Sequence, residues 1–380
     1  MSRIDELIAD HCPDGVEFKM LGEVLRIKNG KDHKALADGD IPVYGSGGIM
    51  RYANSAAAEG PSVLIPRKGS LGNLFYVEGP FWVVDTIFRT EIDLSMVEPK
   101  FLYHQLLTMG LGGMNQAGGV PSQTQSVLNL LRIPVPPLEV QREIVRILDQ
   151  FTQLEAELEA ELEARRRQYA SYRDSLVSAV EGPRVAMGEL GTFMRGRRFT
   201  KNDVVESGIP SIHYGEIYTD YGVSAARAKR EVKSDILSQL RFAQPGDVIF
   251  AGVGETVVDV GKAVAWLGDG PVAVHDDTFS FTSELNPKYV AYAVQTDYFH
   301  TQKANYVARG KIKRLSVAGL SRINIPVPTS EEQARIVAIL DKLDALVNDV
   351  SIGLPAELAA RRKQYEYYRD RLLTFEEISA

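Results

Sequence analysis

Two glycine-containing segments resemble nucleotide-binding loops without completing the motif. Val260-Gly261-Lys262-Ala263 lacks the upstream glycine, since Thr256 stands there, and Ala263 replaces the hydroxyl residue that binds magnesium. Gly45-Ser46-Gly47-Gly48 is rich in glycine but has no strand–turn–helix context, so it is typical of a turn. We therefore expect no phosphate cradle in this chain.

A carboxylate–lysine group of nuclease type is also incomplete. Glu98-Pro99-Lys100, with Asp85 or Asp93 upstream, resembles the carboxylate pair and lysine of a metal-dependent nuclease. The related segment Asn286-Pro287-Lys288 in the second half of the chain lacks the acid. A helix that starts with proline in its first turn explains both segments, so we do not expect nuclease chemistry.

The histidines and the cysteine form no pattern of metal ligands. None of the six histidines follows another at a spacing of two or four residues, and Cys12 is the single cysteine. His275 beside Asp276 and Asp277 is the group that most resembles a ligand set. A histidine at a strand end, held by its neighbours, is the simpler interpretation. We predict no catalytic residue, no metal and no cofactor in this chain, which is therefore not an enzyme.

Basic and amide side chains gather instead in several short clusters. Arginine and lysine pair with phosphates and with guanine, whereas asparagine and glutamine pair with adenine. Each cluster alone could be a solvated loop, but together they favour contact with double-stranded DNA. The candidate DNA-binding residues are Lys28, Lys31, Arg67, Lys68, Gln123, Gln125, Arg195, Arg197, Arg198, Lys201, Arg309, Lys311, Lys313 and Arg314.

The composition is that of an ordinary globular protein. Of the 380 residues, 44% are hydrophobic and 24% are charged, and the net charge is -7. That charge argues mildly against nucleic acid, but eight acids against two arginines fall between residues 139 and 164. With no membrane-length apolar run and no secretory signal in the first 15 residues, we expect a soluble, cytoplasmic protein without membrane contact.

The chain contains an internal duplication. IPVPPLEVQREIVRILDQ (133–150) matches IPVPTSEEQARIVAILDK (325–342), and ARRRQYASYRDSLV (164–177) matches ARRKQYEYYRDRLL (360–373). LGEV (21–24) matches MGEL (187–190), and VVDT (83–86) resembles HDDT (275–278). Ordered matches of this length indicate two copies of one unit, a mixed domain followed by a long helix.

Apolar residues at spacings of three and four predict two long helices. The first should run from about Leu138 to about Ala179, with Ile144, Phe151, Leu154, Leu158 and Leu162 in its seam. The second should start at a capping box of Thr329 and Glu332 and break near residues 353–355, at Gly353-Leu354-Pro355. Neither helix can bury its seam alone, so we expect the two to pack antiparallel as a coiled coil.

Short apolar runs after Gly-Pro or Pro-Gly predict strands at 62–65, 81–84 and 247–250, and residues 99–107 and 287–294 predict helices. The fold class is therefore α+β, twice, with short strands in each mixed domain. We expect an N-terminal segment (1–20), a first globular domain (21–137), a first long helix (138–180), a second globular domain (187–329) and a second long helix (330–375).

The repeated I-P-V-P…Q…I-V…I-L-D and R-(R/K)-Q-Y…Y-R-D blocks resemble the specificity subunit of type I restriction–modification systems, a phage-defence family. The resemblance covers nearly the whole chain. It implies that residues 21–137 and 187–329 are target-recognition domains, each reading one half of an asymmetric bipartite DNA target. It further implies two methyltransferase (M) subunits docked on the helices, with ATP-dependent nuclease–translocase (R) subunits joining through them. S-adenosylmethionine, ATP and magnesium would belong to those partner subunits.

Two sets of helix residues take roles from this resemblance. The tetrads Ala156-Glu157-Leu158-Glu159 and Ala160-Glu161-Leu162-Glu163 are similar to the four-residue repeats of one branch of the family, and they would set the half-site spacing. An alternative is that they only keep the helix soluble. The repeated tyrosines and arginines are our candidates for partner binding, although they could instead pack the helices together: Tyr169, Tyr172, Arg173, Tyr365, Tyr368 and Arg369.

The chain order is circular, because DGVEFKMLGEV near the N-terminus resembles the continuation that the second helix lacks. We therefore expect the terminal segments to lie together and the molecule to be pseudo-two-fold. Three alternatives remain open: a specificity subunit of another multisubunit methyltransferase–nuclease, a self-contained DNA-modifying enzyme, and a coiled-coil scaffold that binds no DNA.

Overall fold

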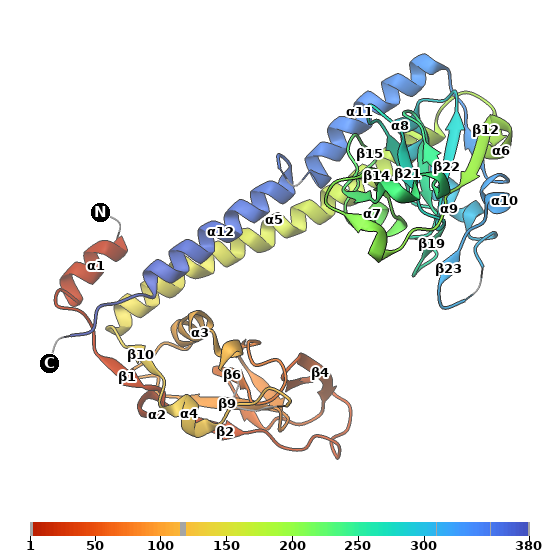
Figure 1. Cartoon of the computed structure of the whole chain (residues 1–380). Coiled ribbons are helices and arrows are strands. Elements are labelled where there is room, and N and C mark those ends of the chain that lie inside the picture. The colour runs from red at the N-terminus through yellow and green to blue at the C-terminus, as the bar shows by residue number, and fades with distance from the viewer. Residues whose placement is uncertain (1–2, 115–118, 309, 350, 379–380) are drawn as a thin grey trace. The chain divides into compact units, whose positions relative to one another are not determined.

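The computed structural model describes residues 3–114, 119–308, 310–349 and 351–378. The chain divides into two compact units (Figure 1): residues 1–157 with 358–380, and residues 158–357. The first unit holds the first domain, and the second unit holds the second domain. Among the described residues, no helix combines the length and the apolar character that a bilayer crossing would require.

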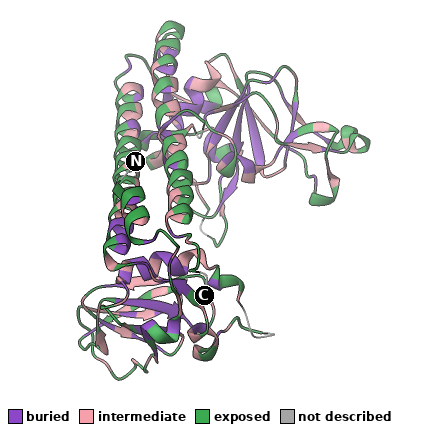
Figure 2. Cartoon of the chain, turned by 90° about the vertical axis from the view of Figure 1, so that its left-hand side faces the viewer, coloured by how far each residue is buried: buried purple, intermediate pink, exposed green. Residues whose placement is uncertain are grey.

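The helical part consists of one uninterrupted helix and one divided helix. Helix α5 spans Leu138–Ser178, whereas α11 (Ser330–Asn348) and α12 (Leu354–Leu372) share the second repeat. Thr329 caps α11 by accepting the Glu332 amide, but the Glu332 carboxylate pairs with Arg335 at 2.7 Å, so the predicted capping box is only half formed. The sheets are largely buried and much of the helix surface is exposed (Figure 2).

In the first unit, α5 and α12 pack antiparallel. The Phe151 ring stacks on Tyr368 at 5.4 Å between centroids, and one turn further along α5 the Glu155 carboxylate pairs with Arg362 at 2.6 Å. The residue numbers of the partners on α12 thus decrease as those on α5 increase, so the two helices run antiparallel, as predicted. Leu154 was predicted in the seam but is 47% exposed, because it projects from the side of α5 that faces solvent.

In the second unit, the distal part of α5 packs on α11. Tyr169 and Val177 of α5 share one buried cluster with Ile336, Leu340 and Val347 of α11. Both units therefore use the apolar stripe of α5, and the predicted pairing of the two repeat helices is confirmed in each.

The first domain contains two four-stranded sheets. In the first sheet the order is β2 (Leu25–Asn29), β9 (Ile87–Ile92), β6 (Ser62–Pro66) and β7 (Phe75–Val77). In the second it is β4 (Gly48–Ala53), β3 (Ile41–Gly45), β8 (Pro80–Val83) and β5 (Ala58–Glu59). The helices are α2 (Leu21–Val24), α3 (Pro99–Thr108) and α4 (Gln125–Asn129). All five residues of β6 are buried, which explains its uninterrupted apolar sequence.

The second domain repeats this plan with an extra strand in each sheet. One sheet has the order β12 (Gly191–Arg195), β22 (Thr278–Ser283), β18 (Val248–Ala251), β20 (Ala263–Trp266) and β15 (Ser224–Ala225). The other has β13 (Val204–Val205), β16 (Arg230–Val232), β14 (Ile209–Ile212), β21 (Val272–Val274) and β17 (Phe242–Ala243). A ribbon of β19 (Val253–Gly254) and β23 (Lys313–Arg314) lies beside them, with helices α6 (Met187–Leu190), α7 (Tyr214–Thr219), α8 (Pro287–Ala293), α9 (Asp297–Lys303) and α10 (Val317–Leu320). The predicted α+β duplication is confirmed.

Equivalent short strands anchor each domain to α5 or α11. In the first domain β1 (Phe18–Met20) pairs with β10 (Arg132–Pro134), and in the second β11 (Arg184–Ala186) pairs with β24 (Asn324–Pro326). Within the first unit, the Val16 amide donates to Glu376 O at 2.9 Å, and Arg132 pairs with Glu377. The two terminal segments are therefore adjacent, as the circular chain order predicted.

The segments that resembled a nuclease motif are helix starts. Glu98 accepts the Phe101 amide at 2.8 Å and so caps α3, and Asn286 caps α8 in the same way. Lys100 pairs with Asp149 of α5 at 2.8 Å, and its counterpart Lys288 pairs with Asp341 of α11 at 2.6 Å. These lysines therefore hold each domain on its helix.

Strand register corrects one predicted match. Asn29 at the end of β2 pairs with Phe88, and its counterpart Arg195 at the end of β12 pairs with Phe279. Residues 83–86 consequently correspond to 274–277, one position before the predicted 275–278. The sequence match of 83–86 with 275–278 was misleading because the loop before β22 contains two aspartates, Asp276 and Asp277, where the first domain has a single aspartate.

Candidate nucleic-acid interface

A close backbone contact shapes the candidate surface of the first domain. Gly30 follows β2 directly, and a Cβ at this position would lie 1.9 Å from Val84 O. The next amide, of Lys31, donates to Val83 O at 2.8 Å. Only glycine fits this crossing, and the crossing turns Lys31 outward at the end of the sheet.

The second domain contains the same contact. A Cβ at Gly196 would lie 2.2 Å from His275 O, and the Arg197 amide donates to Val274 O at 2.9 Å. We call Gly30 and Gly196, with the carbonyls they approach, the glycine crossings. They place Lys31 and Arg197 at equivalent positions, which no sequence match had aligned.

Three of the predicted clusters meet at the glycine crossing of the first domain. The backbone N–H of Gln123 donates to Arg67 O at 3.0 Å, and the backbones of Lys68 and Ser122 form a β-bridge. Gln125 Nε2 donates to Asn29 Oδ1 at 3.3 Å. Loops that are far apart in the sequence therefore form one surface, with Lys31 and Lys68 exposed on it.

The remaining cations of this surface are partly engaged within the protein. Lys28 lies 3.6 Å from the Glu91 carboxylate, and the Arg67 guanidinium lies over the Phe88 ring, 5.8 Å from its centroid. Lys34, which the sequence analysis missed, is exposed beside a cavity of about 430 Å³. Its signal was present in the sequence, as a third lysine three residues after Lys31.

Gln123 is not available as a DNA contact in this structure. Its side chain is 2% exposed, and Nε2 donates to Pro66 O at 2.5 Å. Its Oε1 has no hydrogen-bond partner within the described parts of the chain. The loop holds Gln123 inward, against the end of β6, which the sequence did not indicate, whereas Gln125 is half-buried and bonds Asn29.

In the second domain, two predicted arginines meet at one loop. Arg195 Nε donates to Asp276 O at 2.7 Å, and Arg314 Nη1 lies 3.2 Å from Asp277 Oδ1. Both arginines line a cavity of about 470 Å³ together with Asp276 and Asp277. The strand pair β12–β22 and the ribbon β19–β23 thus bring together clusters that lie more than a hundred residues apart.

The other cations of the second domain surround this loop less tightly. Arg197, Arg198, Lys201 and Lys311 are exposed. Lys313 Nζ donates to Gly310 O at 2.8 Å. Arg309 lies outside the described residues.

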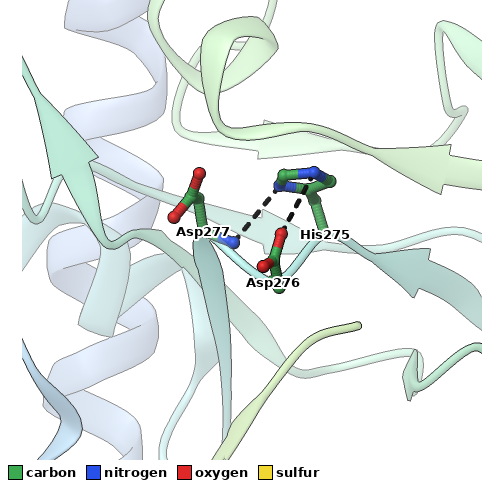
Figure 3. A group of neighbouring side chains, drawn as sticks. All are labelled: His275, Asp276 and Asp277. Atoms are coloured by element: carbon green, nitrogen blue, oxygen red, sulfur yellow. Dashed lines mark hydrogen bonds and ion pairs between the residues drawn. The ribbon is translucent and has the colours of Figure 1, made fainter. Parts of the chain in front are cut away.

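His275, Asp276 and Asp277 lie close together (Figure 3), with candidate ligand atoms within 4.8 Å of one another. His275 Nδ1 accepts the Asp277 amide at 3.2 Å, so the neutral ring carries its proton on Nε2, which donates to Phe199 O at 3.2 Å. Burial lowers the pKa of His275. The Asp276 carboxylate lies 3.2 Å from His275 Nε2, and the Asp277 carboxylate lies 3.2 Å from Arg314 Nη1, so the three side chains are held by one another and by their neighbours.

The candidate partner-binding residues divide between the seam and the surface. Tyr172 is 50% exposed, whereas Tyr169 is 7% exposed within the α5–α11 cluster. Burial and Asp344 raise the pKa of Tyr169, so it stays a neutral phenol. For Tyr169 the structure favours the alternative that these tyrosines pack the helices together, because the apolar stripe of α5 turns it toward α11.

In the first unit, the counterparts are also partly engaged. The Tyr365 hydroxyl lies 3.3 Å from His104 Nδ1, Tyr368 stacks on Phe151, and Arg369 pairs with Asp370 at 2.7 Å. Tyr367, which the sequence analysis did not single out, is 61% exposed.

The remaining helix candidates vary in exposure. Arg173 pairs with Asp174 at 2.8 Å. In the tetrads, Ala156 and Ala160 are exposed, Leu158 is half-buried and Leu162 is buried.

Comparison with known proteins gives one consistent result. The family described as "Type I restriction modification DNA specificity domain" matches residues 13–164 and 184–360. The chain is 32% identical to a putative type I restriction enzyme specificity subunit of Haemophilus influenzae, over 95% of this chain and 96% of that protein. It is 30% identical to the EcoR124I/EcoR124II specificity subunit of Escherichia coli, over 99% and 97% of the two chains.

Solved structures share the fold. An S subunit of a type I restriction–modification system from M. genitalium matches with a TM-score of 0.52 and 14% identity, over 94% of this chain and 96% of that one. A chain from a study of complex assembly and conformational transition in the type I system matches with a TM-score of 0.65 and 19% identity, over 95% and 98%.

Proposed function

Because this chain belongs to the family of type I restriction–modification DNA specificity subunits, we propose that it selects the DNA sequence on which such a complex acts. It is a recognition subunit and not an enzyme, since its relatives are specificity subunits and catalysis lies in other subunits of these complexes. Each globular domain reads one half of a bipartite target in double-stranded DNA.

The observation that carries this proposal is the pair of glycine crossings. Each crossing presents a cation, Lys31 or Arg197, at the same corner of the same fold. A duplicated phosphate contact on duplicated domains suits a duplex with two binding sites. Since the loops around the two crossings differ in sequence, the two half-sites differ and the target is asymmetric.

The division of labour among side chains follows from their exposure. Exposed Lys31, Lys68, Arg197, Arg198 and Lys201 hold phosphates and fix the register of each domain on the duplex. Residues in the loops between them contact base edges. Arg195 and Arg314 orient the second domain's loop through Asp276 and Asp277, and they can also reach phosphates at its rim.

The partners are DNA and the other subunits of the complex. Two methyltransferase subunits dock on the repeat helices, and nuclease–translocase subunits join through them. The methyltransferases bring S-adenosylmethionine and flip the target adenine out of the stack, and the translocases bring ATP and magnesium.

Methylome sequencing tests the proposal directly. Cells that express this chain with its methyltransferase partner should gain N6-methyladenine at one bipartite, asymmetric motif. A purified chain without partners should transfer no methyl group, and it should cut no DNA. Methylation without a defined motif, or methyl transfer by the chain alone, would refute the proposal and favour the scaffold or the self-contained enzyme.

Docking on the helices has a separate test. Tyr172→Ala with Tyr368→Ala should abolish co-purification with the methyltransferase, since these positions recur in both repeats and Tyr172 is exposed. Ser175→Ala is the matched control, because Ser175 is exposed on the same helix and the second repeat has Arg371 there. Adding Arg173→Glu and Arg369→Glu should strengthen the effect. Full binding by all these variants, with unchanged helix content, would refute the assignment.

In this proposal, the number of Ala-Glu-Leu-Glu tetrads in α5 sets the distance between the two DNA half-sites. The tetrads lie within the uninterrupted α5, where each tetrad adds about 6 Å of helix. Ala156 and Ala160 are exposed and contribute little to packing, so a role in length is compatible with their small side chains.

A further inference from the structure

The two domains differ most at one equivalent place. Strand β3 pairs in parallel with β8 (Val43 opposite Trp82), and β14 pairs in parallel with β21 (Ser211 opposite Ala273). After β3 the chain turns back as the hairpin strand β4, whereas after β14 it continues into helix α7. The shared frame of both domains therefore carries a different structure directly beside each glycine crossing.

The hairpin of the first domain contains a β-bulge. Val43 lies opposite Arg51, but Tyr44 lies opposite Ile49, so Met50 has no partner in the ladder. Bulges turn a side chain out of the regular alternation and are frequent beside functional sites. Met50 accordingly lines the cavity of about 430 Å³ that also contains Lys34 and Thr86.

The tip of this hairpin is tied to the basic surface. The Ser46 amide donates to Thr86 Oγ1 at 3.3 Å, and Asn73 Nδ2 donates to Ser46 O at 3.4 Å. The loop that contains Asn73 begins at Arg67 and Lys68, so the tip sits beside the cations of the glycine crossing. The predicted turn at Gly45–Gly48 is thereby held at the candidate interface.

The hairpin exposes large apolar side chains where charged ones are usual. Ile49 is 48% exposed, Met50 59% and Tyr52 50%, and β4 forms an edge of its sheet within the described residues (Figure 1). Edge strands normally carry charges or proline, because an exposed apolar edge invites aggregation. An apolar edge is therefore retained here for contact with a partner.

Charge identifies that partner as duplex DNA. Lys31, Lys34 and Lys68 are exposed on the loops that border the hairpin tip, where they outnumber the exposed Asp32 and Asp85 that line the same cavity as Met50. Cations on the flanks suit the phosphate backbones, and the apolar edge strand β4 with its turn suits the major groove, where thymine presents its methyl group.

We propose that the β3–β4 hairpin is the base-reading element of the first domain, with Ile49 and Met50 against base edges in the major groove. Lys31, Lys34 and Lys68 hold the phosphates beside it. Helix α7 occupies the equivalent place in the second domain, which gives the second half-site its different sequence. This inference rests on the proposed function and names the part of the domain that determines specificity.

The test compares variants of this chain in the assembled complex. Met50→Gln and Ile49→Thr should change or relax one or two positions of one half-site in the methylome, and they should leave the other half-site unchanged. Affinity for the wild-type motif should fall roughly tenfold, the usual cost of one lost base contact. The salt dependence of binding should not change, because no phosphate contact is removed.

Leu94→Ala is the matched control. Leu94 is also a large exposed apolar residue of the first domain, at 54%, but it follows the end of β9 opposite the glycine crossing. This variant should keep the wild-type motif, and Met50→Leu should keep most of it.

Two results would overturn the inference. One is an unchanged motif, methylated at the wild-type rate, in both Met50→Gln and Ile49→Thr. The other is loss of methyltransferase binding in these variants, which would make the hairpin a protein-docking surface. Absence of any motif in the wild-type complex would instead refute the proposed function itself, so the two failures are distinguishable.

Discussion

Replacing Gln141 by methionine should destabilise the first domain selectively. Gln141 lies in the first turn of α5 and is fully buried. Its Oε1 accepts the Glu98 amide at 2.8 Å, and its Nε2 donates to Met96 O at 2.9 Å and to Pro136 O at 2.7 Å. One amide thus joins the start of α3, the loop before it and the start of α5.

The expected cost follows from the groups left without partners. Methionine has nearly the same shape, so the change removes hydrogen bonds with little loss of packing. One buried and two part-buried backbone groups lose their partners at about 1–3 kcal/mol each, and partial relaxation brings the expected total to about 3–5 kcal/mol. Gln333, the repeat counterpart, accepts the Asn286 amide at 2.8 Å and donates to Pro328 O at 3.0 Å. With two groups affected, Gln333→Met should cost about 2–4 kcal/mol.

Hydrogen–deuterium exchange combined with urea titration measures the loss of unfolding free energy in each variant and shows which domain is weakened. Gln141→Met should lower the protection of α3 and spare α8, and Gln333→Met should do the reverse. Gln153→Met is the control, since Gln153 is exposed and bonds only Glu157 among the contacts found for it; it should change stability by less than about 0.5 kcal/mol. The reasoning is refuted if Gln141→Met lowers the free energy of unfolding no more than Gln153→Met does. It is also refuted if each variant weakens both domains equally, because the hydrogen bonds of Gln141 and Gln333 would then not stabilise their own domains.

Three further outcomes are expected. The double variant Arg197→Ala and Arg198→Ala should weaken binding of the assembled complex to all DNA sequences by about tenfold or more. The slope of the logarithm of the binding constant against the logarithm of salt concentration should become shallower by up to about 2. A changed methylation motif with an unchanged slope would contradict the proposed contact with phosphates. A third Ala-Glu-Leu-Glu tetrad inserted after Glu163 should lengthen the undefined spacer of the DNA target by one or two base pairs and leave both half-sites intact. The reason is that the tetrad adds about 6 Å of helix length and about 40° of helix rotation. Methylation with the original spacer would contradict the role of the tetrads in setting the half-site distance. Lys303 is buried, donates to Val258 O and Val260 O, and has its pKa lowered by burial to about 8. Above that pH the folded chain loses a proton that the unfolded chain keeps up to about pH 10.5, so the folded state gains stability as the pH rises. Urea titrations should therefore show the stability of the wild type, relative to Lys303→Met, rising between pH 8 and 10. A flat or falling difference would contradict the lowered pKa of Lys303.

Local patterns in the sequence predicted much of the fold. The length of α5, the division of the second helix and the proline-started helices at 99 and 287 all depend on residues close together in the chain, and the duplication is visible as a match between segments of the sequence. Periodic apolar residues select a helix because one stripe must be buried, and capping side chains act within one turn. Such signals need no knowledge of distant contacts, so they were sufficient for the α+β class and for the family resemblance.

The candidate surface depends on contacts that no local pattern encodes. Strand register sets the glycine crossings and holds Lys31 and Lys68 on the same segment, 83–86, while Arg195 and Arg314 meet at Asp276 and Asp277 in the other domain. Register also moved the correspondence of residues 83–86 by one position, and loop packing turned Gln123 inward. Whether a polar residue is exposed or buried is decided by what lies against it, and for these residues the neighbours come from far along the chain. Tyr169 and Tyr172 differ by three residues on one helix, and packing against α11 and α8 makes the first a core residue while the second stays on the surface.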